Sequence, residues 1–168
     1  MTVLRVAESS AAWALPKFPL VGDLPDLNVW LALVLADHPH HAAARRYWDE
    51  VRPGPAVVGP QIWFCRATML GLVRLLSQPK VMGTAALTVG EAHAVYLQLR
   101  HTSGVGFVPD TEIADTPLSE RLTLAPSLPA RLWTDAWLCA TADSAGLRLV
   151  SFDVDFERLA PARLLRLH

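Results

Sequence analysis

The chain has 168 residues, of which 52% are hydrophobic and 18% are charged. This length suits one domain with a single substantial core, and the composition excludes a disordered chain. The formal net charge of −1 excludes a polycation that wraps nucleic acid by bulk charge. Any contact with RNA must therefore come from a local patch of positive side chains.

The two cysteines, Cys65 and Cys139, both lie in apolar helical contexts. We interpret them as buried small hydrophobic side chains in a reducing cytoplasm and not as a disulfide or a zinc pair. No apolar run reaches membrane-spanning length, and the first twenty residues lack a continuous apolar core. We therefore expect a cytoplasmic protein with no membrane contact.

The first 21 residues show no clean periodicity, so we expect an N-terminal extension at residues 1–21 and one domain at residues 22–168. The next segment predicts a short strand that ends at Asp26, although Pro25 is unusual for a central strand. A helix is expected from Asn28 to about residue 36. Asp26 then stands at a strand exit above a helix start, the edge of a parallel sheet where ligands bind.

Three histidines, His38, His40 and His41, mark a break before a second helix at residues 42–51. Their spacing does not match the common zinc patterns, and no Cys or acidic residue completes a set. We favour a helix-boundary role for the cluster over a metal site.

The middle of the chain predicts a short strand at 56–59 and a long, mostly buried helix at 62–77, which Pro79 ends. Thr88 and Glu91 form a capping-box pattern at the start of a helix that runs to residue 100. A strand at 106–109 follows. Alternation of short strands with helices indicates a parallel sheet covered on both faces.

The last third predicts a loop at 110–129 over the sheet edge, with a short helix around 118–122, and an edge strand at 164–167. Between them, residues 132–156 read as a helix capped by Thr134, a stop at Gly146, and a strand at 147–152. About eleven helical residues span roughly 17 Å, and six extended residues span roughly 20 Å. The helix and the strand can therefore run antiparallel through a tight turn.

This antiparallel pair would bring Asp135, in the first turn of the helix, close to Asp153, directly after the strand. Two carboxylates held together repel each other, and a metal cation is the usual compensation. The alternative is that one Asp caps a helix and the other lies in a turn. The segment alone leaves both interpretations open.

Three segments in this order resemble VapC-type toxins, the PIN-domain ribonucleases of toxin–antitoxin pairs. They are residues 24–33 followed by 38–45, residues 65–76 ending at 79–83, and residues 132–138 followed by Gly146 and 152–156. The resemblance implies an α/β fold, a PIN-like three-layer α/β/α sandwich with a central, mostly parallel five-stranded sheet.

The same resemblance implies a carboxylate cluster that holds Mg²⁺ or Mn²⁺. Carried over residue by residue, its catalytic and metal-binding members are Asp26, Asp135 and Asp153, with Asp155 as an outer metal ligand and Asn28 supporting the first Asp. Many relatives carry Glu or Gln where Met69 stands, and a thioether does not hold Mg²⁺. We favour a packed helix residue at Met69. If the missing acid weakens the site, Met69→Glu should tighten metal binding.

The activity that the resemblance implies is metal-dependent endonucleolytic hydrolysis of RNA, with tRNA or rRNA as the substrate. The implied partners are a cognate VapB-type antitoxin and a second copy in a homodimer. Arg66 and Arg74 are candidates for the RNA backbone, with internal salt bridges as the alternative. Three aromatic residues are candidates for an antitoxin groove, with core packing as the alternative: Tyr47, Trp48 and Trp63.

Three other functions compete with this interpretation. A degenerate PIN domain would bind a partner without cutting RNA, which Met69 alone supports. A phosphoacceptor or flavodoxin-like module would also place acids at strand ends, but a receiver domain needs a Lys after a late strand, and the only lysines are Lys17 and Lys80. A Rossmann enzyme needs a G-x-G-x-x-G loop, and the sequence has none.

Overall fold

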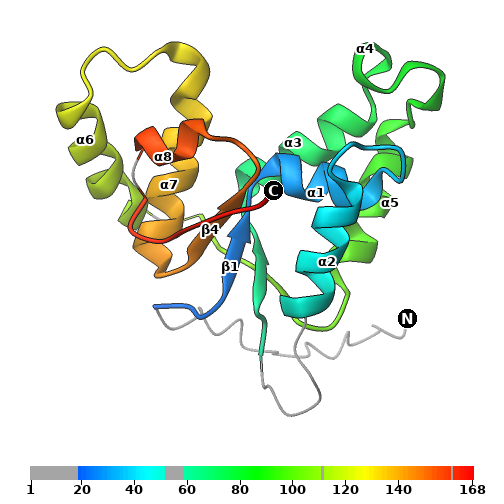
Figure 1. Cartoon of the computed structure of the whole chain (residues 1–168), viewed down its shortest axis with the longest axis horizontal. Helices are drawn as coiled ribbons and strands as arrows, with labels where there is room; N and C mark the ends of the chain where they lie inside the picture. Colours follow the sequence, from blue (N-terminus) through cyan, green and yellow to red (C-terminus); the bar gives the residue numbers. More distant parts are fainter. Residues whose placement is uncertain (1–18, 52–58, 111, 160) are drawn as a thin grey trace, which may run out of the picture.

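The computed structural model describes residues 19–51, 59–110, 112–159 and 161–168. Five strands form one sheet in the order β3-β2-β1-β4-β5, and every neighbouring pair is parallel (Figure 1). The strands are β1 (Asp23–Pro25), β2 (Ile62–Phe64), β3 (Val105–Phe107), β4 (Arg148–Ser151) and β5 (Leu164–Arg166). The prediction of a five-stranded parallel sheet is confirmed, and β1 is its central strand.

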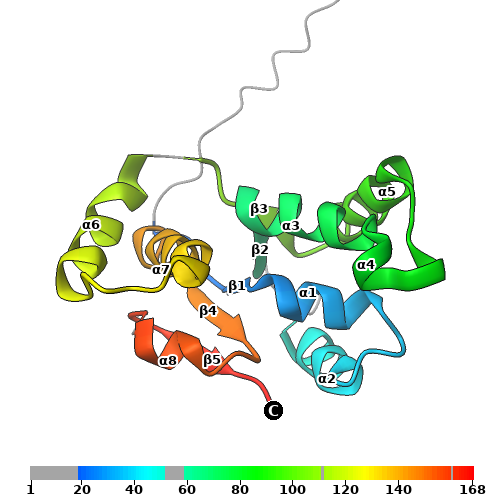
Figure 2. The same cartoon turned by 90° about the horizontal axis from the view of Figure 1, so that it is seen from above.

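Helices cover both faces of this sheet. They are α1 (Leu27–Val34), α2 (His41–Val51), α3 (Arg66–Leu76), α4 (Pro79–Met82), α5 (Val89–Arg100), α6 (Asp115–Leu124), α7 (Trp133–Ala145) and α8 (Asp155–Leu159), with 3₁₀ turns η1 (Gly83–Ala85), η2 (Glu112–Ala114) and η3 (Ala130–Leu132). Figure 2 shows α6 and α7 on one side of the sheet and α1, α2, α3 and α5 on the other. The α/β/α sandwich is therefore confirmed.

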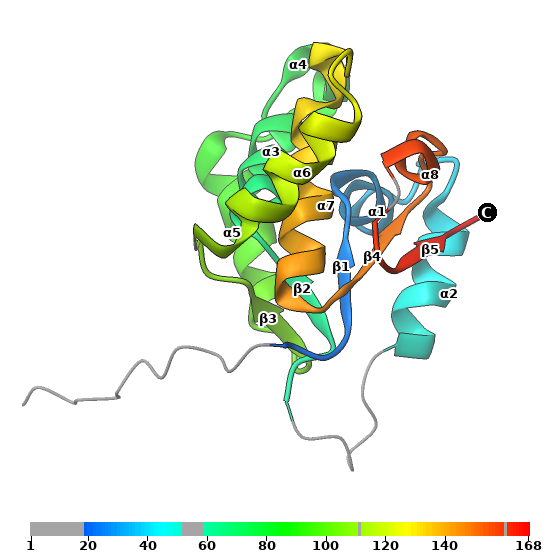
Figure 3. The same cartoon turned by 90° about the vertical axis from the view of Figure 1, so that its left-hand side faces the viewer.

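Strand alternation divides the core into layers. Successive side chains of a strand point to opposite faces, so Ile62 and Phe64 pack with α1, α3 and α5 while Trp63 packs on the α7 side. Figure 3 shows α7 running alongside the sheet with α6 outside it. The sheet is thus buried on both faces, which explains the high hydrophobic content of the chain.

The helix–strand unit predicted near residue 146 forms as expected. Gly146 ends α7 in the left-handed region (φ 74°), and the Leu147 N–H closes the turn onto the Ala142 carbonyl at 2.9 Å. The predicted cap at Thr134 is wrong, because turn η3 runs directly into α7 and places Leu132 at the cap position. Thr134 lies inside the first helical turn.

The boundary of the predicted helix at 62–77 is also wrong. Residues 62–64 form strand β2, and α3 starts only at Arg66, after Cys65 in extended conformation donates its N–H to Thr68 Oγ1 at 3.1 Å. A strand buried on both faces and a buried helix present the same continuous apolar run, so the pattern does not separate them. Of the strand predicted at 56–59, residues 56–58 lie outside the described part of the chain.

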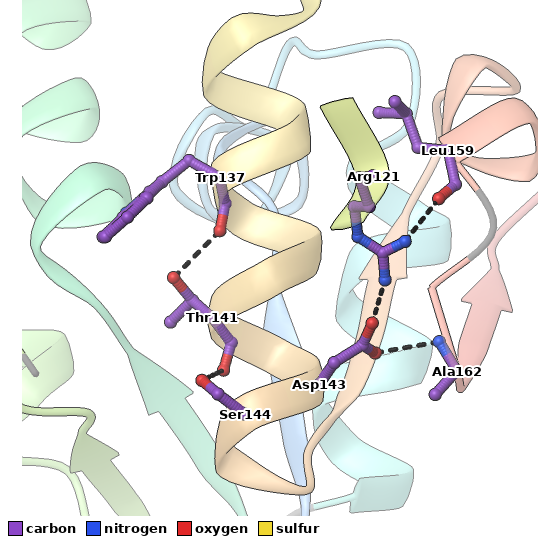
Figure 4. A network of polar contacts seen from close by, with 7 residues as sticks. All are labelled: Arg121, Trp137, Thr141, Asp143, Ser144, Leu159 and Ala162. Atoms are coloured by element: carbon purple, nitrogen blue, oxygen red, sulfur yellow. Dashed lines mark hydrogen bonds and ion pairs between the residues drawn. The ribbon is translucent and has the colours of Figure 1, made fainter. Parts of the chain in front are cut away.

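The segment predicted as a loop over the sheet edge is largely helical. Helix α6 is longer than the helix expected around 118–122 and packs against α7. Its Arg121 pairs with Asp143 of α7 and donates from Nη1 to the Leu159 carbonyl at the end of α8, at 2.8 Å (Figure 4). Asp143 Oδ1 also accepts the Ala162 N–H at 2.8 Å. Through Arg121, helix α6 is therefore bonded to both α7 and α8.

Several local predictions are confirmed. Thr88 and Glu91 form the expected capping box on α5, with the Thr88 N–H on Glu91 Oε2 at 2.8 Å. Both cysteines are buried and unbridged, and β5 is an edge strand. No helix in the described part of the chain has the length and hydropathy needed to cross a membrane.

The division at residue 22 stays a prediction, because residues 1–18 lie outside the described ranges. Within the proposed extension, Leu20 is buried in the core and donates its N–H to the Ala145 carbonyl at 2.7 Å.

Candidate active site

Asp26 lies where β1 ends and α1 begins. Its Oδ1 accepts the Leu27 N–H at 2.6 Å, so the carboxylate caps α1, and its Oδ2 accepts the Ser151 hydroxyl at 3.1 Å. The pKa of Asp26 is raised to about 7, chiefly by burial and also by the negative charges of Asp135 and Asp153, against the hydrogen bonds from Leu27 and Ser151 that lower it. The site therefore holds this carboxyl group where a negative charge is costly.

Ser151, the last residue of β4, joins the parts of this edge, and the sequence analysis missed it. Its side chain is fully buried, and its Oγ accepts from Asn28 Nδ2 at 3.0 Å and from the Asp153 N–H at 2.9 Å. Because the same hydroxyl donates to Asp26, one group orients three others. The available signal was a hydroxyl residue ending a buried strand two positions before an Asp. Asn28 supports this network as predicted.

Asp135 lies in the first turn of α7 and is half-buried. Burial is the main cause that raises the pKa of Asp135, and the negative charges of Asp153 and Asp155 also raise it. The positive charge of Arg131 lowers it. Among the described side chains and backbone groups, none donates a hydrogen bond to this carboxylate. Asp135 is thus a carboxylate whose charge the surrounding protein compensates only weakly.

Asp153 and Asp155 occupy different environments. Asp153 Oδ1 accepts the Asp155 N–H at 2.8 Å, so Asp153 caps the start of α8. Asp155 instead faces arginines, with Oδ2 at 2.6 Å from Arg131 Nη1 and Oδ1 at 3.6 Å from Arg158 Nη1. The hydrogen bond and charge of Arg131 lower the pKa of Asp155. As an outer metal ligand, Asp155 would first have to leave these ion pairs.

The structure brings Asp26, Asp135 and Asp153 into one electrostatic neighbourhood, because the charges of Asp135 and Asp153 act on the pKa of Asp26 and the charge of Asp153 acts on that of Asp135. It does not bring them into a closed chelate: no three His, Cys, Asp or Glu side chains of the described ranges form a group ready to hold a metal ion. The donor set is nonetheless made of hard oxygens, which suit Mg²⁺ or Mn²⁺. The capping alternative holds for Asp153, and Asp26 also caps a helix, so the role of these carboxylates as ligands stays a prediction.

Met69 does not lie on the face of α3 that meets the start of α1. It is partly buried beside Val89 and His93 of α5, in a groove of about 400 Å³. Gly71 meets α1 instead, since a Cβ there would approach Leu27 Cδ2 to 2.6 Å. Two residues of helix rotate the side-chain direction by about 200°. Met69 is therefore a packing residue, as favoured from the sequence.

The other candidate contacts have mostly internal partners. Arg66 Nε pairs with Asp110 Oδ2 at 3.0 Å, so the salt-bridge alternative holds for this residue. Tyr47, Trp48 and Trp63 are only 4–7% exposed. The core-packing alternative therefore holds for all three, because they fill the core between sheet and helices.

A fully buried acid, Asp23, lies at the opposite end of β1. It accepts from the Tyr47 hydroxyl at 3.0 Å and from Arg148 Nε and Nη2 at 2.8 Å each. Burial raises the pKa of Tyr47, and the charge and hydrogen bond of the neighbouring Asp23 carboxylate raise it further. Full pairing of this kind indicates a structural role, in contrast to the weakly compensated acids at the other edge.

The chain is similar to known proteins over most of its length. Residues 24–161 match the family model described as PIN domain. Ribonuclease VapC41 of Mycobacterium tuberculosis is 37% identical over 140 residues, which cover 79% of this chain and 90% of that protein.

Two solved structures share the fold. VapBC2 from Rickettsia felis, bound to a DNA fragment from its promoter, matches with a TM-score of 0.63 at 10% identity, over 87% of this chain and 98% of that one. VapC20 of Mycobacterium tuberculosis, a Sarcin-Ricin loop cleaving toxin, matches with a TM-score of 0.56 at 16% identity, over 82% and 94%.

Proposed function

The chain belongs to the PIN domain family, and from that premise we propose that it is a VapC-type endoribonuclease toxin neutralised by a VapB-type antitoxin. The observation that carries the proposal is the set of weakly compensated carboxylates at one sheet edge: Asp26, Asp135 and Asp153. An ordinary structural acid is paired, as Asp23 is. A protein that keeps three carboxylates together at a cost in stability is expected to use them.

We further propose that Asp26, Asp135 and Asp153 hold Mg²⁺ or Mn²⁺. A hard divalent ion bound there would stabilise charge on the scissile phosphate and lower the pKa of the attacking water. Ser151 keeps Asp26 oriented through its hydroxyl, and Asn28 fixes that hydroxyl in turn. Both act as positioning residues behind the carboxylates.

Arg131 is the described cation best placed to meet the RNA backbone. It is exposed, it precedes α7, and Asp155, Asp153 and Asp135 all act on its pKa. An incoming phosphate would compete with Asp155 for the same guanidinium fork. The proposed substrate is a structured RNA, tRNA or rRNA, in which a PIN ribonuclease would read an exposed loop.

A protein partner is supported by the groove between α3 and α5. Leu70 and Val89 are 57% and 66% exposed at this groove, which is a large apolar exposure for two neighbouring helices. The homodimer and the antitoxin complex remain the proposed assemblies. Leu70→Asp is expected to shift the oligomeric state in light scattering without changing the far-UV circular dichroism.

A second candidate function is a degenerate PIN domain that binds a partner without cutting RNA, and two observations favour it. The described carboxylates do not form a group of three ready to hold a metal ion, and Asp155 is held by arginines. Direct metal binding separates the two functions, because only the nuclease needs Mn²⁺ at this edge.

The experiment compares the wild type with Asp26→Asn, Asp135→Asn and Asp153→Asn. Cleavage of end-labelled tRNA and rRNA is followed in Mn²⁺ and in EDTA, and Mn²⁺ binding is measured by calorimetry. Each substitution is expected to lower cleavage at least about 100-fold, equivalent to about 2.7 kcal/mol of transition-state stabilisation.

Asp49→Asn is the matched control, because Asp49 is an exposed acid of α2 that pairs only with Arg45. Cleavage that persists in EDTA, or that the three substitutions leave intact, would refute the proposed site. Absence of both cleavage and Mn²⁺ binding in the wild type would favour the degenerate domain.

A further inference from the structure

The histidine cluster at the α1–α2 junction has a feature that a helix boundary does not require. His41 serves the boundary, with its Nδ1 2.8 Å from the Ala32 carbonyl oxygen, and the His40 N–H donates to His38 Nδ1 at 3.2 Å. The His40 ring, however, stacks on Phe152, with centroids 4.4 Å apart and planes 16° from parallel. This contact joins two segments far apart in the sequence.

Phe152 stands inside the candidate active site. It lies between Ser151, which holds Asp26, and Asp153, and its N–H donates to Asn28 Oδ1 at 3.4 Å. Phe152 and the proposed metal ligand Asp153 are consecutive residues, so their Cα atoms are about 3.8 Å apart. The Phe152 side chain also packs against two core clusters, which anchors it.

The outer part of this stack is open to solvent. His40 is exposed although one face of its ring is covered by Phe152, and the His38 ring lies 5.7 Å away at 45°. None of the three histidines pairs with an acid of the described ranges. The stack is thus a supported, solvent-exposed aromatic surface, and Phe152 within it is the residue directly before Asp153.

We propose that His40, supported by Phe152, is a base-stacking platform that holds an unpaired nucleobase of the RNA next to the cleaved bond. Aromatic side chains, His included, receive splayed-out bases in this way, and every base offers a π-face. The platform would place the adjacent phosphate over the carboxylates. The proposal rests on the proposed ribonuclease function and adds a substrate-positioning residue to it.

The test measures RNA binding separately from cleavage. In the Asp135→Asn background, in which cleavage is expected to be lowered, and in EDTA, binding of short single-stranded and loop RNAs carrying 2-aminopurine is followed by anisotropy and by fluorescence quenching. His40→Ala is expected to weaken binding about 5- to 150-fold, the equivalent of about 1–3 kcal/mol for one stacked base. It should also abolish the quenching.

Two further variants separate stacking from charge. His40→Phe keeps a ring and should restore both binding and quenching, whereas His40→Lys keeps a positive group without a ring and should restore neither. His101→Ala is the control, since His101 follows α5 at the edge where the strands begin. Thermal unfolding of each variant checks the fold.

Equal binding by wild type and His40→Ala, or rescue by Lys but not by Phe, would overturn the platform. Weakening of an antitoxin complex alone would also overturn it, because the surface would then serve a protein. If Asp26→Asn leaves cleavage intact while the His40 series behaves as expected, the proposed metal site fails and the platform stands.

Discussion

Asp26→Asn is expected to stabilise the metal-free protein at pH 8 much more than at pH 5. The pKa of Asp26 is raised from 3.8 to about 7, chiefly by burial. Below pH 3.8 the folded and unfolded states both carry the proton, so ionisation costs nothing. Between about pH 4 and pH 7 the unfolded state ionises while the folded state keeps its proton, and stability falls as the pH rises. Above about pH 7 the cost is constant.

The magnitude follows from the size of this pKa difference. A rise of about 3 units corresponds to about 4 kcal/mol at pH 8, as an upper limit, and at pH 5 only about 1.6 kcal/mol of it has developed. Asn still accepts the Leu27 N–H as a helix cap, but loses the bond from Ser151 at about 1–3 kcal/mol. That loss is the same at both pH values. The stability difference between variant and wild type should therefore be about 2 kcal/mol larger at pH 8.

The assay is urea unfolding in EDTA at pH 5 and pH 8, with Asp49→Asn as the exposed control. Addition of Mn²⁺ at 100 times its dissociation constant should then stabilise the wild type by about 2.7 kcal/mol and the Asp26→Asn variant by less. If the difference in free energy of unfolding between Asp26→Asn and wild type does not change with pH, the raised pKa of Asp26 is refuted. Equal stabilisation by Mn²⁺ would refute the ligand role.

Three further substitutions test other parts of the molecule. Asp23→Ala should lower the free energy of unfolding by about 2–3 kcal/mol, the low end for a buried pair because Arg148 is about one-third exposed; an unchanged urea midpoint would contradict a structural role. Thr88→Ala should cost about 1 kcal/mol through loss of the α5 cap, with RNA cleavage at the wild-type rate. Met69→Glu should leave Mn²⁺ affinity unchanged in calorimetry, because Met69 faces the α3–α5 groove; tighter binding would show that this position reaches the carboxylates after all.

Signals carried by neighbouring residues were read correctly from the sequence. Gly146 ends α7 because only a residue without Cβ adopts the left-handed region at no cost, and Thr88 with Glu91 starts α5 because both caps lie within one turn. A helix and a strand of matched length, joined by that glycine turn, also predict that Asp135 and Asp153 lie close together, and the charge of Asp153 acts on the pKa of Asp135. These features depend on short segments and on backbone geometry alone.

Contacts between distant segments were decided only by the tertiary structure. Residues 62–64 become a strand because β1 and β3 offer hydrogen bonds on both sides. Ser151 reaches Asp26 across 125 residues of sequence because the adjacent parallel strands β1 and β4 bring their carboxyl ends to one edge. His40 stacks on Phe152 because the α1–α2 junction lies beside the end of β4. Side-chain pairing of this kind depends on how whole elements pack, and a local residue pattern does not identify the partner.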